Sequence, residues 1–252
     1  MEAIINEVSS ILSQFDPISL EQMSGIKLMN RIDTKYLVNV NQLPTLLKMA
    51  QNDYYAQEID GSRIASYRTV YYDTQDAEMY VVHHNRKLNR QKIRMREYVG
   101  SGQFFLEIKN KNNKGRTKKV RIKIADDVVA KHSEAVEFIA EKSNYEMDQL
   151  SCRLQNKFSR ITLVNKAKTE RLTIDMNIQF HNFKTNEDGG ISKLCIIELK
   201  QDGNQYSPFR DYFSRLRIKQ KRISKYCLGM VLTDASLKAN RFKDKVFYIN
   251  RL

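Results

Sequence analysis

The chain is poor in the residues that cross-link, bend or interrupt a fold: its 252 residues include no tryptophan, three cysteines, three prolines and nine glycines. Cys152, Cys195 and Cys227 form no Cys-x-x-Cys pair, and their odd number argues against a disulfide framework. No proline-, glycine- or serine-rich tract marks an internal linker. We therefore expect a single domain with one substantial core, in a reducing cytoplasmic compartment.

Long apolar runs are missing as well. No stretch of about 18 uncharged apolar residues is present, which excludes a membrane-spanning helix. The N-terminal segment MEAIINEVSSILSQF has helical spacing and contains acidic residues, without the basic start and continuous apolar run of a signal peptide. The sequence thus predicts a chain with no membrane span of its own.

Acidic residues are scarce relative to basic ones. The chain has 43 Lys and Arg against 29 Asp and Glu, a net charge of +14 and a pI near 9.6. This balance favours an anionic partner, namely nucleic acid, anionic lipid or a phosphate compound. No helix-turn-helix, zinc-finger or RNP-like motif is visible, and the aromatic residues lie mostly at core spacing, so nucleic acid is the weakest of the three.

Periodicity predicts an α+β chain with eight strands. The strands are expected at 31–40, 64–72, 91–99, 103–111, 116–124, 160–165, 171–180 and 193–200. Helical spacing is expected at 2–14, 20–29, 41–51, 76–84, from about 125 to 159, at 207–217 and at 225–239. The segments VGSGQ and NNKG supply hairpin turns, and Tyr72-Asp73 reads as a turn at a strand end. Eight strands are enough to close a small barrel.

Alternate residues of the predicted strands collect charge of mostly one sign on one face. The cations are Arg31, Lys35, Lys92, Arg94, Arg96, Lys109, Lys111, Lys119, Arg121, Lys123, Arg171 and Lys200, against only Asp33, Glu107, Asp175 and Glu198. A solvated outer face is the plain alternative. However, like charges on neighbouring strands destabilise a sheet, and Arg-x-Arg at 94–96 and Lys-x-Arg at 119–121 suit phosphate oxygens. The face is therefore predicted to hold phosphates.

The motifs RIDTKYLV, YYDT, HHNRKLNRQKIRMREY, FLEIKNK, KKVRI, SRITL, RLTID, IIELK and RISKYCLG occur in that order. In this order they resemble the catalytic domain of the vacuolar transporter chaperone (VTC) family, a polyphosphate polymerase of the triphosphate tunnel metalloenzyme, or CYTH-like, superfamily. The resemblance covers roughly residues 25–232. It implies an eight-stranded antiparallel barrel with a basic, hydrated interior, and helices packed outside and at the C-terminus.

The resemblance also implies a division of the single domain over 1–252. Residues 1–29 would form N-terminal helices, 30–200 the barrel strands with inserted helices, and 201–252 the C-terminal helices and tail. The family's N-terminal SPX sensor domain and transmembrane segment have no counterpart in the sequence, so we expect a stand-alone member of bacterial type.

Site residues follow from the motifs together with the charged face. Catalytic roles fall to Arg94, Arg96, Lys109 and Arg171, and phosphate-binding roles to Lys35, Lys119, Arg121, Arg160, Lys200, Arg222, Ser224 and Lys225. Glu198 matches the residue that binds Mn²⁺ or Mg²⁺. Arg222 stands where a lysine is more usual. The Glu-x-Glu-x-Lys motif of the wider superfamily is replaced by Arg31-Ile-Asp33-Thr-Lys35, which argues against thiamine-triphosphatase or adenylate-cyclase activity.

The implied function is metal-assisted transfer of the terminal phosphate of a nucleoside triphosphate, with ATP expected, to a growing inorganic polyphosphate chain. The alternatives are a metal-dependent inorganic triphosphatase and a non-catalytic polyphosphate- or nucleotide-binding module. Few acids lie on the basic face, and hydrolysis needs a base that an anionic phosphate acceptor does not, so transfer is favoured over hydrolysis.

Overall fold

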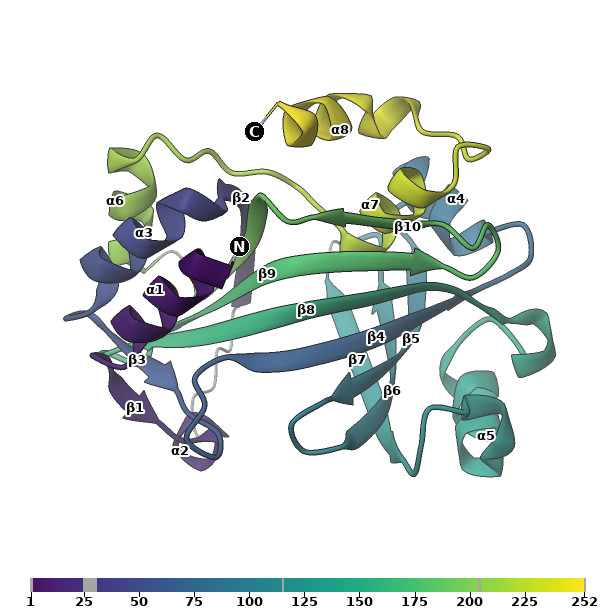
Figure 1. The fold of residues 1–252 in the computed structure, drawn as a ribbon. Helices are drawn as coiled ribbons and strands as arrows, with labels where there is room; N and C mark the ends of the chain where they lie inside the picture. Colours follow the sequence, from purple (N-terminus) through teal and green to yellow (C-terminus); the bar gives the residue numbers. More distant parts are fainter. Residues whose placement is uncertain (1, 25–30, 115, 204, 252) are drawn as a thin grey trace.

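Eight antiparallel strands form the body of the molecule, and the computed structural model describes residues 2–24, 31–114, 116–203 and 205–251 (Figure 1). In sheet order the strands are β2 (Arg31–Asn39), β11 (Leu194–Asp202), β9 (Glu170–Asn182), β8 (Ser151–Asn165), β4 (Ala65–Asp73), β5 (Arg90–Tyr98), β6 (Gln103–Lys111) and β7 (Thr117–Ile124). The α+β class and the eight antiparallel strands are confirmed. Closure into a barrel stays a prediction, because no ladder joins β2 to β7 within the described ranges.

Three short strands were not predicted. β1 (Asp16–Ile18) pairs in parallel with β3 (Tyr54–Gln57), β3 also pairs with β8, and β10 (Asp188–Ile191) extends the sheet beside β9. The helical expectation for 151–159 was wrong, since these residues form the first half of β8. The register shifts between Lys157 and Ser159, opposite Asn177, whose φ of +51° marks a bulge.

Helices cover the outer face of the sheet at both ends. α1 (Glu2–Leu12), α3 (Leu43–Ala50) and α6 (Pro208–Arg215) share one apolar cluster with outward residues of β2, β11, β9 and β8, such as Ile174 and Ile197. α5 (Ser133–Lys142) packs in the same way on β6 and β7, in an apolar cluster that includes Ile93, Met95 and Leu106. Apolar side chains therefore point outward from the strands, which leaves the charged set on the inner face.

The helix α7 (Lys225–Thr233) packs instead on the inner face, at one end of it. It shares a cluster with Tyr71, Phe158 and Ile196. A side chain could not be added at Gly229, because a Cβ there would lie 2.5 Å from Leu154 Cδ2. α7 thus covers the β8–β9 part of this end with apolar side chains.

The helix α4 (Glu78–His84) is held by one carboxylate at the end of β4. Asp73 is fully buried and accepts hydrogen bonds from the backbone of Thr74 and Met79 at 2.8 and 2.9 Å, and from Tyr80 N at 3.0 Å. The hydroxyl of Tyr226 in α7 donates to the same carboxylate. Tyr72 and Asp73 are the last two residues of β4, and the turn follows them at Gln75 and Asp76. Asp73 joins α4 to α7.

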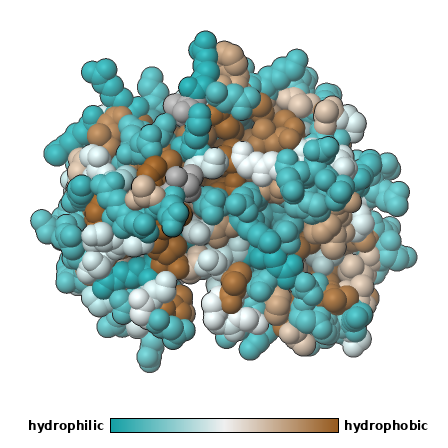
Figure 2. Space-filling model, viewed as in Figure 1, coloured by the Kyte–Doolittle hydropathy of each residue, from teal (hydrophilic) through white to brown (hydrophobic). Residues whose placement is uncertain are grey.

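The remaining helices are short. α2 (Leu20–Ser24) lies within the predicted 20–29, of which residues 25–29 fall outside the described chain; α8 (Lys243–Asn250) was not predicted. Short 3₁₀ turns occupy Val40–Gln42, Val129–Lys131, Met147–Gln149 and Asn240–Phe242. None of the described helices is long and apolar enough to cross a membrane. Hydrophilic side chains cover most of the face shown in Figure 2.

Candidate functional site

The register of the ladders places the charged residues on one continuous inner face. Lys35 lies opposite Glu198, and Lys200 lies opposite Arg171. On the other half of the sheet the directly paired rows are Arg94–Glu107–Arg121 and Lys92–Lys109–Lys119. Directly opposite residues point to the same side of a sheet, so these side chains share the inner side.

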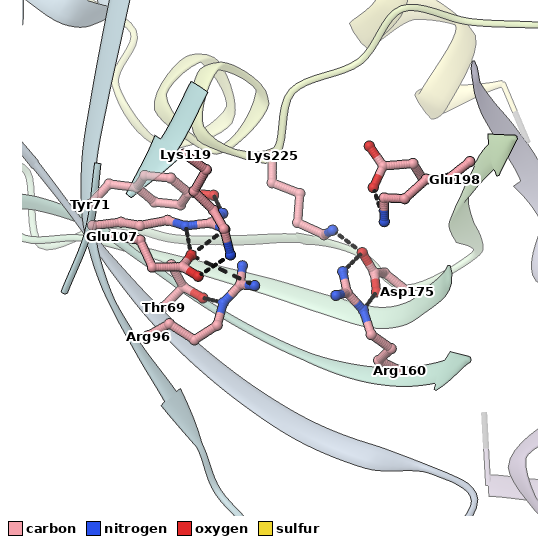
Figure 3. A network of polar contacts seen from close by, with 11 residues as sticks. Thr69, Tyr71, Arg96, Glu107, Lys119, Arg160, Asp175, Glu198 and Lys225 are labelled. Atoms are coloured by element: carbon pink, nitrogen blue, oxygen red, sulfur yellow. Dashed lines mark hydrogen bonds and ion pairs between the residues drawn. The ribbon is translucent and has the colours of Figure 1, made fainter. Parts of the chain in front are cut away.

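Glu107 is the centre of the first charge cluster (Figure 3). Its Oε2 accepts from Arg94 Nε at 2.8 Å and Nη2 at 2.6 Å, and its Oε1 accepts from Lys119 Nζ at 2.9 Å. The Glu107 side chain has no exposed area. Burial alone would raise its pKa, but Arg94, Arg96 and Lys119 outweigh burial and hold the pKa well below its usual value.

Arg96 is held more loosely than Arg94. Its Nη1 lies 3.9 Å from Glu107 Oε2, its Nε lies 3.5 Å from Thr69 Oγ1, and its guanidinium lies 5.7 Å from the ring centroid of Tyr67. Burial, then the charge of Arg94, lowers the pKa of Arg96. A buried guanidinium with such long contacts is well placed to bind an incoming phosphate.

Asp175 is the centre of the second cluster. Arg160 binds it through both ends of the guanidinium, at 2.5 Å from Nε to Oδ1 and 2.8 Å from Nη2 to Oδ2, and Lys225 donates to Oδ2 as well. Burial opposes ionisation of Asp175, yet the two cations hold its pKa well below the usual range. Burial lowers the pKa of Lys225 to about 8, with Asp175 working against the shift.

Glu198 is the centre of the third cluster and the most accessible of the three carboxylates. Its side chain is 20% exposed, compared with 4% for Asp175 and none for Glu107. Lys35 donates to Oε1, and Lys200 Nζ lies 2.8 Å from Oε2. Despite burial, these two lysines hold the pKa of Glu198 well below its usual value, so it is ionised.

The donor set does not form a resident metal site. The described residues include no group of three or more His, Cys, Asp or Glu side chains that could hold a metal ion. Among the described carboxylates of the inner face, Glu198 best fits a cation that arrives already bound to phosphate oxygens, because two lysines rather than an arginine fork hold it. Mg²⁺ is commonly bound in this way, with substrate phosphates and waters as its other ligands.

Two further predicted residues, Lys109 and Arg171, lie along the inner face. Lys109 lies between Lys92 and Lys119 on the ladder, and the charge of Arg94, then burial, lowers its pKa strongly. Arg171 is partly buried and donates to Met23 O at 3.2 Å. Both lie along the charged face.

Three predicted residues lie at its edge or outside it. Ser224 caps α7 through Cys227 N at 3.3 Å and accepts from Lys92 Nζ at 2.8 Å. Arg121 is exposed, with its guanidinium 4.6 Å from the Phe105 ring, and Arg222 is exposed as well. The side chain of Arg31 falls outside the described part of the chain.

Some polar residues of the inner face were given no role from the sequence. Asn156 and Thr173 are buried, and the amide of Asn156 and the hydroxyl of Thr173 have no hydrogen-bond partner among the described residues. Buried polar atoms of this kind call for water or a ligand. Asn156 lies in the segment predicted as a helix, so no signal in the sequence could place it on the inner face. Lys92, by contrast, was visible as one of the face cations.

Comparison with solved structures gives distant likenesses. A putative adenylyl cyclase from Hippeastrum, described as having a dominant triphosphatase activity, is 13% identical with a TM-score of 0.45, covering 82% of this chain and 100% of its own. A putative adenylate cyclase from Vibrio parahaemolyticus is 12% identical with a TM-score of 0.45, covering 80% and 99%. The PH1819 protein of Pyrococcus horikoshii is 14% identical with a TM-score of 0.44, covering 79% and 97%. Likenesses at this level support no statement about function.

The sequence itself matches no curated protein. It does match the family model of the VTC domain, over residues 30–233. The match spans all eight strands of the main sheet, the three carboxylate-centred clusters and α7. This chain belongs to the VTC domain family.

Proposed function

We propose that this protein is a polyphosphate polymerase, which transfers the terminal phosphoryl group of a nucleoside triphosphate, ATP in the first place, to a polyphosphate chain. The observation that supports it best is the cationic inner face, where buried and half-buried cations together outnumber the carboxylates that could neutralise them. Phosphoryl transfer depends on positioning and on neutralisation of the phosphate oxygens more than on covalent help. The proposal takes this face as the wall of a closed tunnel.

In this proposal Arg94, Arg96, Lys109 and Arg171 contact the transferred phosphoryl group. Arg96 contributes most to the transition state, because its present contacts are long and a phosphate oxygen would replace them with a charge-assisted hydrogen bond. Lys35, Lys119, Arg160, Lys200 and Lys225, together with Ser224, bind the neighbouring phosphates of donor and acceptor. Arg121 and Arg222 would meet phosphates only at the edge of the face or beyond it.

The acceptor in this reaction is an ionised terminal oxygen of polyphosphate. A bond forms from that oxygen to the γ-phosphorus, the bond from the γ-phosphorus to the β–γ bridging oxygen breaks, and ADP leaves. No proton has to be removed from the acceptor. That suits an inner face whose carboxylates Glu107, Asp175 and Glu198 all have pKa values held low by cations and are poor bases.

A divalent cation, Mn²⁺ or Mg²⁺, would be held by Glu198 together with the phosphates. When bound it would neutralise charge on the phosphate oxygens. On the protein side, Lys35 and Lys200 exchange their contacts with Glu198 for contacts with phosphate, which frees the carboxylate for the cation.

One observation favours the alternative of an inorganic triphosphatase. Lys225, with a pKa of about 8, is partly neutral near physiological pH, and a neutral amine beside the site can accept a proton from water. Hydrolysis of tripolyphosphate to orthophosphate would then be the reaction.

The test is incubation of the purified protein with ATP and Mn²⁺, with gel detection of polymer and a parallel orthophosphate assay. We expect polymer from the wild type and a loss of about 100- to 1,000-fold in Arg96→Ala. Lys118→Ala, an exposed lysine on the outer side of β7, should remain at the wild-type level. Orthophosphate without polymer would support the triphosphatase, and near wild-type synthesis by folded Arg96→Ala would refute the assignment.

A further inference from the structure

A second group of cations lies beyond the end of the inner face, and the proposed reaction does not use it as a catalytic site. We call it the outer cationic cluster. Its members are Arg86, Arg90, Lys111, Lys221, Arg222 and Lys245. They come from the α4–β5 loop, the adjoining ends of β5 and β6, the segment before α7, and α8.

Ladder register connects this cluster to the inner face. Arg90 pairs with Lys111 one step beyond the pair Lys92 and Lys109. Two residues along a strand advance by about 7 Å, so the row of cations continues along β5 and β6 without a break. Lys92 joins the two regions, since its Nζ lies 2.8 Å from Ser224 Oγ at the start of α7.

The C-terminal segment completes the cluster by packing on α4. Tyr80 of α4 donates to the carbonyl of Lys238 at 2.8 Å, and the His84 ring lies 5.8 Å from the Phe242 ring. Lys221 Nζ lies 4.5 Å from the ring centroid of Tyr248 in α8. In Figure 1, α8 lies in yellow above the sheet on the side of α7 and β10. This segment follows residue 233, where the VTC domain match ends.

Several of these cations act electrostatically on one half-buried imidazole, that of His83. Burial, and then the charges of Lys92, Arg90, Lys245 and Lys111, lower the pKa of His83 to about 2. Its Nδ1 is buried and has no hydrogen-bond partner among the described residues. The ring is therefore neutral, and this Nδ1 lies in a region of positive charge.

Carboxylates do not balance these cations. Across the described ranges of the chain, no ion pair joins any member of the outer cationic cluster to an Asp or Glu. The inner face differs, because each of its three central carboxylates is paired there. Uncompensated cations on adjoining elements repel each other, and a bound polyanion relieves that repulsion.

We propose that the outer cationic cluster binds the distal part of a long polyphosphate chain whose end occupies the inner face. The inference rests on the proposed function for the identity of the polyanion. The continuous row from Arg96 through Lys92 to Arg90 suits a linear polymer of closely spaced charges. A compact ligand such as tripolyphosphate is too short to occupy both regions.

The test compares Lys221→Met/Lys245→Met with Lys118→Met/Lys131→Met, a control that removes two exposed lysines near β7 and α5. Methionine keeps the aliphatic packing of each side chain. Affinities for long-chain polyphosphate and for tripolyphosphate are measured over a series of salt concentrations.

For the cluster variant we expect long-chain affinity to fall about 30-fold, at roughly fivefold per cation beside a dense row of anions. The slope of log affinity against log salt should fall by about 1.4, at roughly 0.7 per cation. Affinity for tripolyphosphate should change less than twofold, and the control should resemble the wild type. Arg86→Gln, a second and fully separate change at an exposed loop residue, should weaken long-chain binding about fivefold.

Four results would overturn the inference: unchanged long-chain affinity in the cluster variant, equal loss in the control, equal loss for tripolyphosphate, or single-stranded RNA of the same charge bound as tightly and lost in the same way. The proposed function is judged separately. Polymer synthesis from ATP by the wild type, together with unchanged long-chain affinity in the cluster variants, would refute the inference alone. Cluster-dependent binding of long polyphosphate by a wild type that makes no polymer would refute the polymerase alone.

Discussion

Replacement of Glu107 by glutamine tests how far the inner face depends on its own carboxylates. The change keeps the size of the side chain and removes a fully buried charge that Arg94 and Lys119 share. Removing one partner of a buried ion pair costs about 3–5 kcal/mol, because the remaining charges are left uncompensated. At roughly 2–4 °C per kcal/mol for a chain of this size, the midpoint of thermal unfolding should fall by about 6–20 °C.

Tripolyphosphate should restore much of this loss. The phosphate oxygens would replace the missing carboxylate, so the ligand should bind Glu107→Gln more tightly than wild type. A ligand at 100 times its Kd stabilises a protein by about 2.7 kcal/mol, and tighter binding adds to this figure. Differential scanning fluorimetry with and without tripolyphosphate measures the gap between the two proteins. An unchanged gap, or no gap without ligand, would refute this account of the face.

Acidification probes the same carboxylate. The pKa of folded Glu107 is depressed below its ordinary value of 4.5, so its contribution to stability is present above that pH and is lost as the pH falls toward the folded pKa. The free energy of unfolding of the wild type should therefore fall below about pH 4.5. That of Glu107→Gln should fall less steeply in urea titrations over the same range.

Three further predictions concern other parts of the molecule. The amine of Lys225 loses its proton as the pH rises through about 8, so tripolyphosphate affinity should fall between pH 7 and 9 by calorimetry; Lys225→Arg should abolish that fall. Glu198→Gln should lose metal-dependent synthesis yet bind tripolyphosphate at least as tightly in metal-free buffer, because its two lysine partners are freed; weaker metal-free binding would contradict this. Gly229→Ala should lower the free energy of unfolding by about 1–3 kcal/mol, since its Cβ would lie 2.6 Å from Phe180 Cδ1. Gly100→Ala, with open space around it, is the control, and equal effects would count against close packing of α7.

The sequence predicted the main sheet because alternation is strong wherever one strand face is apolar and the other charged. It failed at the first half of β8. There Leu154 and Phe158 are four residues apart, which is also helical spacing, and both pack inward against α7. Where a distant helix covers the inner face of a strand, the inner residues are apolar like the outer ones. The alternation of apolar and polar residues that marks a strand is then absent from the local sequence. α8 was missed for a related reason, since its stability depends on packing against segments far away in the chain.

The charged residues of the candidate site could be predicted from the sequence, but the ion pairs between them could not. The residue types and their common face followed from spacing. Which cation holds Glu107, Asp175 or Glu198 depends on strand register, and register depends on the bulge beside Phe158 and on the turns. Arg222 shows the limit of motif matching, because it lies exposed in the outer cationic cluster rather than on the inner face.

The carboxylate of Asp73 connects two helices, α4 and α7. It binds the first turn of α4 and, through Tyr226, the first turn of α7, where Lys225 begins the helix. α4 in turn carries the C-terminal segment through Tyr80. We expect a shift of the C-terminal segment to move Lys225 as well, because α4 and the start of α7 are both bound to the carboxylate of Asp73. A ligand that displaces the C-terminal segment should therefore also shift Lys225 on the cation-lined inner face.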